Sequence, residues 1–232
     1  MKIIVTCGPS YEPIDQVRRL TNFSTGELGV TLANHLSNIG HEVICLKGEG
    51  STFSGEVHTA RLERFATNCD LTSRLKEISA QERIDVIFHA AALCDYRVER
   101  VLNGAGDAIS SRKFATREGG LHLVLAPATK VLPQLRGWFP QSQIVGWKYE
   151  VTGSLEDAFT KVWDQVRECR TDACVLNGAA YGEGFAICQA DRSVKHCAGL
   201  TNLCERLSAL ISSGDAARRR LKENCQCPAA AI

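Results

Sequence analysis

The sequence has no long apolar run and almost no net charge. No stretch of its 232 residues approaches the roughly 18 consecutive apolar residues of a membrane-spanning helix. Met1 and Lys2 lead directly into an apolar, strand-like segment instead of a signal peptide. A net charge of +1 provides no basic surface for nucleic acid or for an anionic membrane. These absences predict a cytoplasmic protein that binds neither nucleic acid nor membrane.

Cysteine spacings typical of metal or redox sites are also lacking. The chain has 11 cysteines but no C-x-x-C. Its only close pair, Cys225 and Cys227, lies in a polar tail and does not make a zinc site without further ligands. In a chain without a secretory signal, scattered cysteines are expected to be free thiols. We therefore predict no disulfide framework and no metal centre built from protein ligands.

A complete dinucleotide fingerprint is missing as well. The segment from Val5 to Gly29 reads as a strand, a glycine-containing loop of about 20 residues and the start of a helix. It contains no G-x-G-x-x-G, and the second strand ends at Leu46-Lys47 where a ribose-binding acid would be expected. A nucleotide-binding oxidoreductase is therefore the least favoured function, and we expect no redox cofactor.

The same segment is rich in groups that can hold an anion. A loop that leads into a helix aims backbone N–H groups and the positive end of the helix dipole at a phosphate. Loops of this length inside a compact domain are usually functional. The candidate binding groups are Gly8, Ser10, Arg18, Asn22, Ser24, Thr25 and Gly26.

The rest of the chain predicts one α/β domain over residues 1–213 and a polar tail over 214–232. The apolar run 84–92 is suited to the middle of a parallel sheet, and we interpret His89 within it as a core histidine. Asp70 is expected to cap a helix, and 101–120 to form a flexible loop or a projecting hairpin. Further expected elements are strands at 57–62 and 144–149, helices at 26–39, 129–139, 154–170 and 201–211, and a hairpin formed by 184–189 and 193–198.

The first motif, G-P-S-x-E-P-I-D-x-V-R-x-x-x-N-x-S-T-G-x-x-G over residues 8–29, closely resembles the signature of phosphopantothenate–cysteine ligases. Residues 91–96 (AALCDY) resemble that family's A-A-V-x-D-Y motif, and residues 145–148 (VGWK) resemble its V-G-F-K motif. The resemblance implies a Rossmann-like three-layer α/β fold with a mainly parallel sheet and a C-terminal antiparallel hairpin. It also implies a homodimer.

The resemblance further implies the substrates and the roles of the site residues. In the family, 4′-phosphopantothenate reacts with a nucleoside triphosphate, CTP or ATP with Mg²⁺, and the acyl nucleotidylate then reacts with cysteine. Asn22 and Arg18 are the candidate catalytic residues, because an amide can stabilise an oxyanion and a guanidinium can hold a carboxylate or phosphate. Besides the loop residues, the candidate binding residues are Ala91, Asp95, Thr129, Lys130, Val131, Trp147, Lys148 and Asn177.

The sequence departs from the family at three basic positions. Ala108, Gln165 and Cys169 stand where relatives carry lysines that meet the triphosphate. Two hypotheses therefore stay open. One is a divergent ligase that uses substitutes among Lys113, Lys130, Lys148 and Lys161. The other is a degenerate, ligase-like protein that binds a phosphorylated ligand without triphosphate-driven catalysis.

Overall fold

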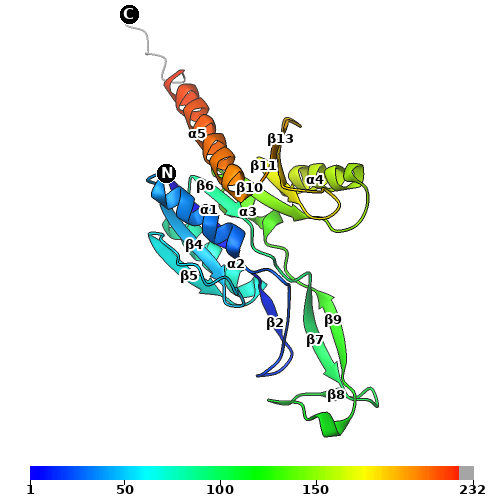
Figure 1. Cartoon of the computed structure of the whole chain (residues 1–232). Coiled ribbons are helices and arrows are strands. Elements are labelled where there is room, and N and C mark those ends of the chain that lie inside the picture. The colour runs from blue at the N-terminus through cyan, green and yellow to red at the C-terminus, as the bar shows by residue number, and fades with distance from the viewer. Residues whose placement is uncertain (225–232) are drawn as a thin grey trace, which may run out of the picture.

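The computed structural model describes residues 1–224, and describes side-chain surroundings for 1–117 and 119–212. Its centre is an eight-stranded sheet in the order β13-β12-β11-β10-β6-β1-β4-β5 (Figure 1). The strands are β1 (Lys2–Cys7), β4 (Glu42–Gly48), β5 (Arg61–Phe65), β6 (Val86–His89), β10 (Gln143–Tyr149), β11 (Ala173–Asn177), β12 (Phe185–Gln189) and β13 (Val194–Cys197).

The sheet is parallel from β5 through β4, β1, β6 and β10 to β11. Strands β12 and β13 then add an antiparallel hairpin at one edge. This arrangement confirms the predicted mainly parallel sheet with a C-terminal hairpin. Because the parallel strands all end at the same edge, the residues that follow them converge there.

Helices cover both faces of the sheet, which gives the expected three layers. The helices are α1 (Glu27–Asn38), α2 (Asn68–Gln81), α3 (Leu132–Trp138), α4 (Leu155–Cys169) and α5 (Leu200–Asn224). Alternate residues of each strand point to opposite faces. On β1, Ile3 packs in the core with α1 and α5, whereas Ile4 packs in the core with α2 and α3. Helix α4 packs on Cys174 and Leu176 of β11, on the α3 side of the sheet.

Local sequence explains where several of these helices begin. Ser154 caps α4 in a capping box with Asp157, which satisfies two N–H groups at the helix start. Helix α2 begins one turn earlier than expected. Its cap is Thr67, which accepts a hydrogen bond from Asp70 N, so the prediction that Asp70 is the cap was wrong. Asp70 instead accepts a hydrogen bond from Ala66 N at 2.9 Å.

An antiparallel arm projects from the carboxyl edge of the sheet (Figure 1). It consists of β7 (Tyr96–Leu102), β8 (Ala108–Ile109), the 3₁₀ turn η1 (Thr116–Glu118) and β9 (His122–Pro127), with strand order β8-β7-β9. Beside its base lies the hairpin of β2 (Tyr11–Pro13) and β3 (Arg19–Thr21), which belongs to the first motif. The segment 101–120 therefore forms much of a projecting hairpin structure.

Two boundaries differ from the sequence-based expectation. Strand β5 occupies Arg61–Phe65, whereas 57–62 was expected. Helix α5 continues to Asn224, through the first part of the segment expected as a tail. Residues 225–232, the rest of that segment, lie outside the described residues, and the division of the chain at 213 stays a prediction. No helix within residues 1–224 combines the length and the apolar character needed to cross a membrane.

Candidate functional site

The first motif is joined to the second by main-chain hydrogen bonds. Ser10 N donates to Ala92 O at 3.2 Å, and Ala92 N donates to Gly8 O at 3.0 Å. Gly8 has a φ of 75°, and a Cβ there would lie 3.3 Å from Gly48 N. Glycine is therefore required where the chain leaves β1. The two motifs, more than 80 residues apart in the sequence, form one structure at the carboxyl ends of β1 and β6.

Ser10 is a buried residue whose hydrogen bonds connect the loops of this structure. Its hydroxyl donates to Asn68 Oδ1 at 2.7 Å and accepts from Cys94 N at 2.8 Å. Asn68 in turn donates to the carbonyls of Cys94 and Thr129. The Ser10 side chain has no exposed surface, so its hydroxyl here organises the loops rather than facing solvent.

Arg18 links the β2–β3 hairpin to the arm. Its guanidinium forms an ion pair with Asp15 at 2.5 Å and donates to Phe114 O at 3.1 Å. Burial acts to raise the pKa of Asp15, but hydrogen bonds from Val17, Phe114 and Arg18 outweigh it and hold that pKa below its ordinary value. The Arg18 side chain is still 39% exposed, which leaves part of it open to a ligand.

Asn22 lies where the two motifs meet. Its Nδ2 donates to Ala92 O at 3.2 Å and to Leu93 O at 3.1 Å, and both bonds use the amide nitrogen. The side chain is thereby fixed at an exposed position beside the end of β6. Because both N–H groups are used, an incoming acceptor has to replace one of these two carbonyls as the partner of the amide.

Helix α1 begins within the last residues of the first motif. Gly26 has a φ of 84°, and a Cβ there would lie 2.2 Å from Ser51 Oγ, so only glycine fits. The Thr25 hydroxyl accepts from Glu27 N at 3.2 Å. Ser24 forms no hydrogen bond with any described residue. Gly26, the residue that precedes the helix, has no side chain to cap it, so the N-terminal N–H groups after Glu27 N stay open to an anion.

A cavity of about 180 Å³ lies next to these loops, between the end of β6, the start of α3 and helix α4. Six candidate binding residues line it: Ala91, Asp95, Thr129, Lys130, Val131 and Trp147. Gln165, at one of the family's lysine positions, also lines it. The first-motif residues, Lys148 and Asn177 are not among its lining residues.

Asp95 and Lys130 form an ion pair across the mouth of this cavity. The side chains are 70% and 61% exposed, so the pair contributes little to stability and a ligand can separate it. Both charges are therefore available to a ligand that supplies a cation to Asp95 and an anion to Lys130.

Trp147 lines the cavity and also packs against the hydrophobic core. Its side chain packs against the core on the α1 and α5 side of the sheet, and its Nε1 is buried without a partner among the described residues. Its main-chain carbonyl accepts from Gln165 Nε2 at 3.2 Å on the cavity side. The stacking of Trp147 on a nucleobase stays a prediction.

His89 and Asn68 line the cavity and were missing from the predicted site. His89 is only 6% exposed, in keeping with a core histidine, yet it belongs to the cavity wall. Burial lowers its pKa to about 4. The sequence held one sign that His89 could line a site. It stands at the carboxyl end of a central parallel strand, where ligands of such sheets bind.

The low pKa of His89 predicts a measurable pH dependence of stability. Since the folded protein holds this histidine neutral, its contribution is complete above the ordinary pKa of 6.5 and is lost as pH falls towards 4. We expect wild type to lose about 1.5 kcal/mol more unfolding free energy than His89→Asn between pH 6.5 and 5, because the unfolded histidine is half protonated at pH 6.5 and almost fully protonated at pH 5. Urea unfolding of both proteins measures this difference, and equal losses would contradict it.

The two remaining lysine positions of the family lie apart from the cavity. Cys169 is only 8% exposed, on the inner side of α4, and its pKa is raised by burial. Ala108 is exposed in β8, an element that Figure 1 shows in the part of the arm remote from the sheet. Of the three replaced positions, only Gln165 therefore faces the cavity.

Two other lysines converge on one carboxylate near the end of β10. Lys161 from α4 contacts Glu150 at 2.5 Å, and Lys148 from β10 contacts it at 3.4 Å. Burial acts to raise the pKa of Glu150, but the hydrogen bond from Lys161 and the charge of Lys148 outweigh it, so the pKa is lowered. The Glu150 side chain is 12% exposed, whereas the side chains of Lys148 and Lys161 are 31% and 45% exposed. The group carries a net positive charge at the edge where ligands bind.

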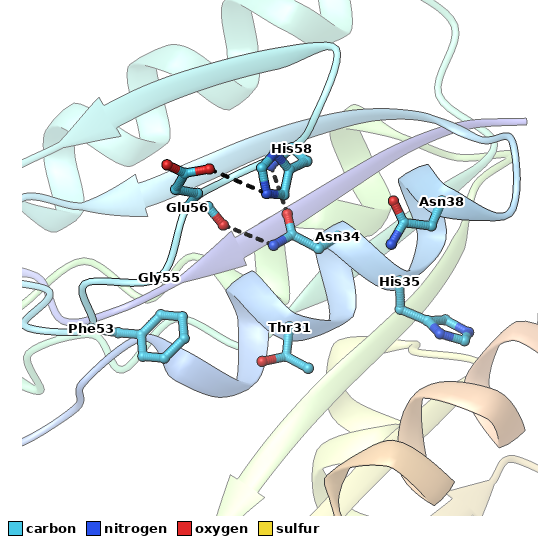
Figure 2. A pocket seen from close by; sticks show the side chains of 8 residues that line it. All are labelled: Thr31, Asn34, His35, Asn38, Phe53, Gly55, Glu56 and His58. Carbon is cyan, nitrogen blue, oxygen red and sulfur yellow. Dashed lines mark hydrogen bonds and ion pairs between the residues drawn. The ribbon is translucent and has the colours of Figure 1, made fainter.

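A larger cavity of about 420 Å³ lies against α1, and no residue of the three motifs lines it (Figure 2). Thr31, Asn34, His35 and Asn38 of α1 form one wall, and the chain from Phe53 to His58 forms the other. Asn34 ties the walls together, donating to Glu56 O at 2.8 Å and accepting from His58 N at 2.7 Å. The volume is greater, but six of the candidate binding residues line the smaller cavity and none lines this one.

Within residues 1–224, apart from side chains not described, no group of three or more histidine, cysteine or acidic side chains could hold a metal ion. The chain is an open α/β protein with a cavity at the carboxyl ends of its parallel strands, the place where such folds bind small molecules. The chain belongs to the family described as the DNA/pantothenate metabolism flavoprotein C-terminal domain, whose model matches residues 1–202. The family resemblance seen in the sequence is thereby confirmed.

Curated relatives of the chain include two bifunctional proteins of coenzyme A biosynthesis. The CoaBC protein of Thermococcus kodakarensis is 29% identical over 177 residues, which are 76% of this chain and 41% of that protein. The CoaBC protein of Bacillus subtilis is 27% identical over 184 residues, 79% of this chain and 42% of that protein. The chain thus spans less than half the length of these two relatives.

Solved structures show the same fold. The DNA/pantothenate metabolism flavoprotein of Streptococcus pneumoniae matches with a TM-score of 0.79 at 21% identity, over 92% of this chain and 99% of that one. A Cab2 mutant in complex with phosphopantothenate-cysteine matches with a TM-score of 0.71 at 16% identity, over 94% of this chain and 88% of that one. At these identities the comparison establishes the fold.

Proposed function

We propose that this chain is a ligase that joins 4′-phosphopantothenate to cysteine in coenzyme A biosynthesis. The observation that carries the proposal is the meeting of the two family motifs at one site, where Asn22 donates to the carbonyls of Ala92 and Leu93. Family membership supports it, and so does a structural neighbour whose description names phosphopantothenate-cysteine.

The proposed reaction has two steps. An oxygen of the substrate carboxylate attacks the α-phosphorus of a nucleoside triphosphate, and pyrophosphate leaves. The cysteine amine then attacks the acyl carbon, nucleoside monophosphate leaves, and the amine loses a proton. Asn22 would contact the acyl oxygen as negative charge develops on it, with an N–H that turns away from the carbonyl of Ala92 or Leu93 to do so. Arg18 would hold a carboxylate or phosphate with the exposed part of its guanidinium.

The nucleoside triphosphate, CTP or ATP, would occupy the 180 Å³ cavity and the surface beside it. The open start of α1, with Ser24 and Thr25, offers N–H and hydroxyl groups to phosphate, and Lys130 and Lys148 offer positive charge. Mg²⁺ is usually held by one or two carboxylates together with substrate phosphates. Asp95, an exposed carboxylate at the cavity mouth, fits that role when the ion arrives with the triphosphate.

A second candidate function is binding of a phosphorylated ligand without triphosphate-driven catalysis. The observation that favours it is the neutral Gln165 in the cavity wall, together with a buried Cys169. A charge-assisted hydrogen bond contributes about 1.5–3 kcal/mol, so loss of such contacts could abolish activation of the acid. The Lys148–Glu150–Lys161 group favours the ligase, because it places two ammonium groups near the same edge.

The proposal includes a cytoplasmic homodimer. The arm exposes a row of alternate apolar side chains on β9, with Leu123 at 38% and Leu125 at 42% exposed, and Tyr96 of β7 at 54%. An apolar row on a projecting arm is suited to burial against a second copy.

One coupled assay tests the function. We expect pyrophosphate release that requires both 4′-phosphopantothenate and CTP or ATP, followed by nucleoside monophosphate release when cysteine is added. Pyrophosphate without transfer to cysteine would contradict the second step. Binding of phosphopantothenate with no pyrophosphate from either nucleotide would favour the binding protein instead.

A further inference from the structure

Lys47, near the end of β4, is a buried lysine that forms no ion pair with any described residue. The residue is 5% exposed, and its Nζ donates to Phe53 O at 3.0 Å. A charge withdrawn from water is costly to the fold unless an opposite charge or several hydrogen bonds compensate it. Stability alone therefore does not account for a lysine at this position.

Lys47 lies beside the first turn of α1. Cys45, two positions earlier on β4, packs in the core on the α1 and α5 side, and alternate residues of a strand share a face. Cys7 is the Cα partner of Lys47 on β1. A Cβ on Gly29 of α1 would lie 2.2 Å from Cys7 Cβ, so the first turn of the helix lies directly on that cysteine. Lys47 and the start of α1 are therefore separated by a single residue of β1.

A short chain of hydrogen bonds connects Lys47 to the residue before Gly26. Phe53, whose carbonyl accepts from Lys47, donates its N–H to Thr25 O at 3.0 Å. Ser51 Oγ donates to the same carbonyl at 2.5 Å. These two donors from the loop after β4 fix the peptide that joins Thr25 to Gly26, because its carbonyl and its N–H lie in one plane. This peptide leads into the open N–H groups of α1, so its orientation sets where those groups point.

We propose that Lys47 is a positioning residue for phosphate binding at the start of α1. It acts through Phe53, which holds the peptide between Thr25 and Gly26, and it touches no ligand itself. Its ammonium also lies near the positive end of the helix dipole, and a bound anion relieves the repulsion between these like charges. This role rests on the proposed function, in which a substrate phosphate binds at this helix start, and it belongs to a residue outside the three motifs.

Lys47→Met keeps the length of the side chain and removes its charge and its donor. Inorganic pyrophosphate is the probe, because it carries phosphate groups but no base and requires no catalysis. We expect calorimetric titration at fixed salt to show at least about 10-fold weaker binding than in wild type, because a positive charge and the orientation of the N–H groups are both lost. The melting temperature without ligand should stay within about 5 °C of wild type, since removal of a buried charge offsets the lost hydrogen bond to Phe53.

Turnover provides a second measurement, which a purely structural role would not affect in this way. In the ligase assay, Lys47→Met should raise the KM for CTP or ATP about 10-fold and leave kcat within about 3-fold of wild type. The reason is that the substitution weakens the binding of phosphate and leaves the groups around Asn22 in place.

Ser51→Ala tests whether Lys47 acts through the Thr25 carbonyl. It removes the other donor to that carbonyl without changing the charge. Because both substitutions then release the same peptide, their effects are not independent, and the double variant should bind pyrophosphate within about 3-fold of Lys47→Met. Fully additive losses would overturn this path. Lys195→Met, the same change on the exposed strand β13, is the matched control and should keep wild-type affinity.

The outcomes distinguish this inference from the proposed function. A lower melting temperature of Lys47→Met with unchanged pyrophosphate affinity would make Lys47 a structural residue only and overturn the inference, as would failure of wild type to bind pyrophosphate. Weaker pyrophosphate binding by Lys47→Met, when wild type performs no ligation, would support the inference and reject the ligase. Ligation by Lys47→Met with an unchanged KM would reject the inference and leave the ligase standing.

Discussion

Asn22→Asp is expected to lower ligase turnover by about 100-fold or more, the scale of losing one oxyanion donor. The substitution keeps the size of the side chain but replaces its N–H₂ group by an oxygen. That oxygen would face the carbonyls of Ala92 and Leu93, which the amide now contacts at 3.2 and 3.1 Å. The variant therefore loses both the neutral amide and the hydrogen bonds that hold it beside β6.

The measurement is steady-state turnover with 4′-phosphopantothenate, cysteine and the preferred triphosphate. Asn22 is exposed, so the variant should fold, and its melting temperature should stay within a few degrees of wild type. Asn38→Asp makes the same chemical change at an exposed asparagine of α1 far from the motifs, and it should retain turnover. Near-wild-type turnover of Asn22→Asp would rule out a catalytic role for Asn22.

Much of the fold follows from short-range patterns in the sequence. Continuous apolar runs such as 84–92 predict buried parallel strands, because both faces of such a strand are covered. The hairpin of β12 and β13 was predictable from its alternation and its turn residues. Helix α2 was placed one turn late because Thr67 and Asp70 are both good capping residues, and only the three-dimensional contacts choose between them.

The candidate site was predictable in part, because some of its residues stand next to strand or helix ends that the sequence predicts. The predicted binding residues that line the cavity, such as Ala91 and Thr129, follow strands or precede a helix at the carboxyl edge. His89 was interpreted as a core residue, since a histidine inside an apolar run carries no sign that a cavity opens beside it. The other walls of that cavity come from the start of α3 and from Gln165, 76 positions later in the sequence, which meet His89 only in the folded protein.

The structure also shows that the three positions without the family's lysines have different surroundings. Ala108, Gln165 and Cys169 are equivalent as departures from the family pattern, yet only Gln165 faces the cavity. Cys169 is buried, and Ala108 is exposed on β8 of the arm. The sequence could not predict that Lys148 and Lys161 share one carboxylate, because they lie on different elements and meet through Glu150.

If the chain is a divergent ligase, that lysine pair should supply the charge for the triphosphate. The double variant Lys148→Met, Lys161→Met keeps the length of both side chains and removes both ammonium groups. Each charge-assisted contact contributes about 1.5–3 kcal/mol, so two lost contacts should weaken binding of CTP or ATP by about 100-fold or more. Binding of phosphopantothenate should change little, because neither lysine belongs to the first motif.

Calorimetric titration at two salt concentrations checks the cause. Salt screens exposed charges, so wild-type affinity should fall as salt rises, and the double variant should be less sensitive to salt. Lys195→Met, a matched change on the exposed strand β13, should leave affinity and salt dependence unchanged. Glu150→Gln should tighten triphosphate binding, since the two lysines would no longer be neutralised by a carboxylate. Unchanged affinity in the double variant would show that these lysines do not replace the family's pair, and the degenerate binding protein would become the better hypothesis.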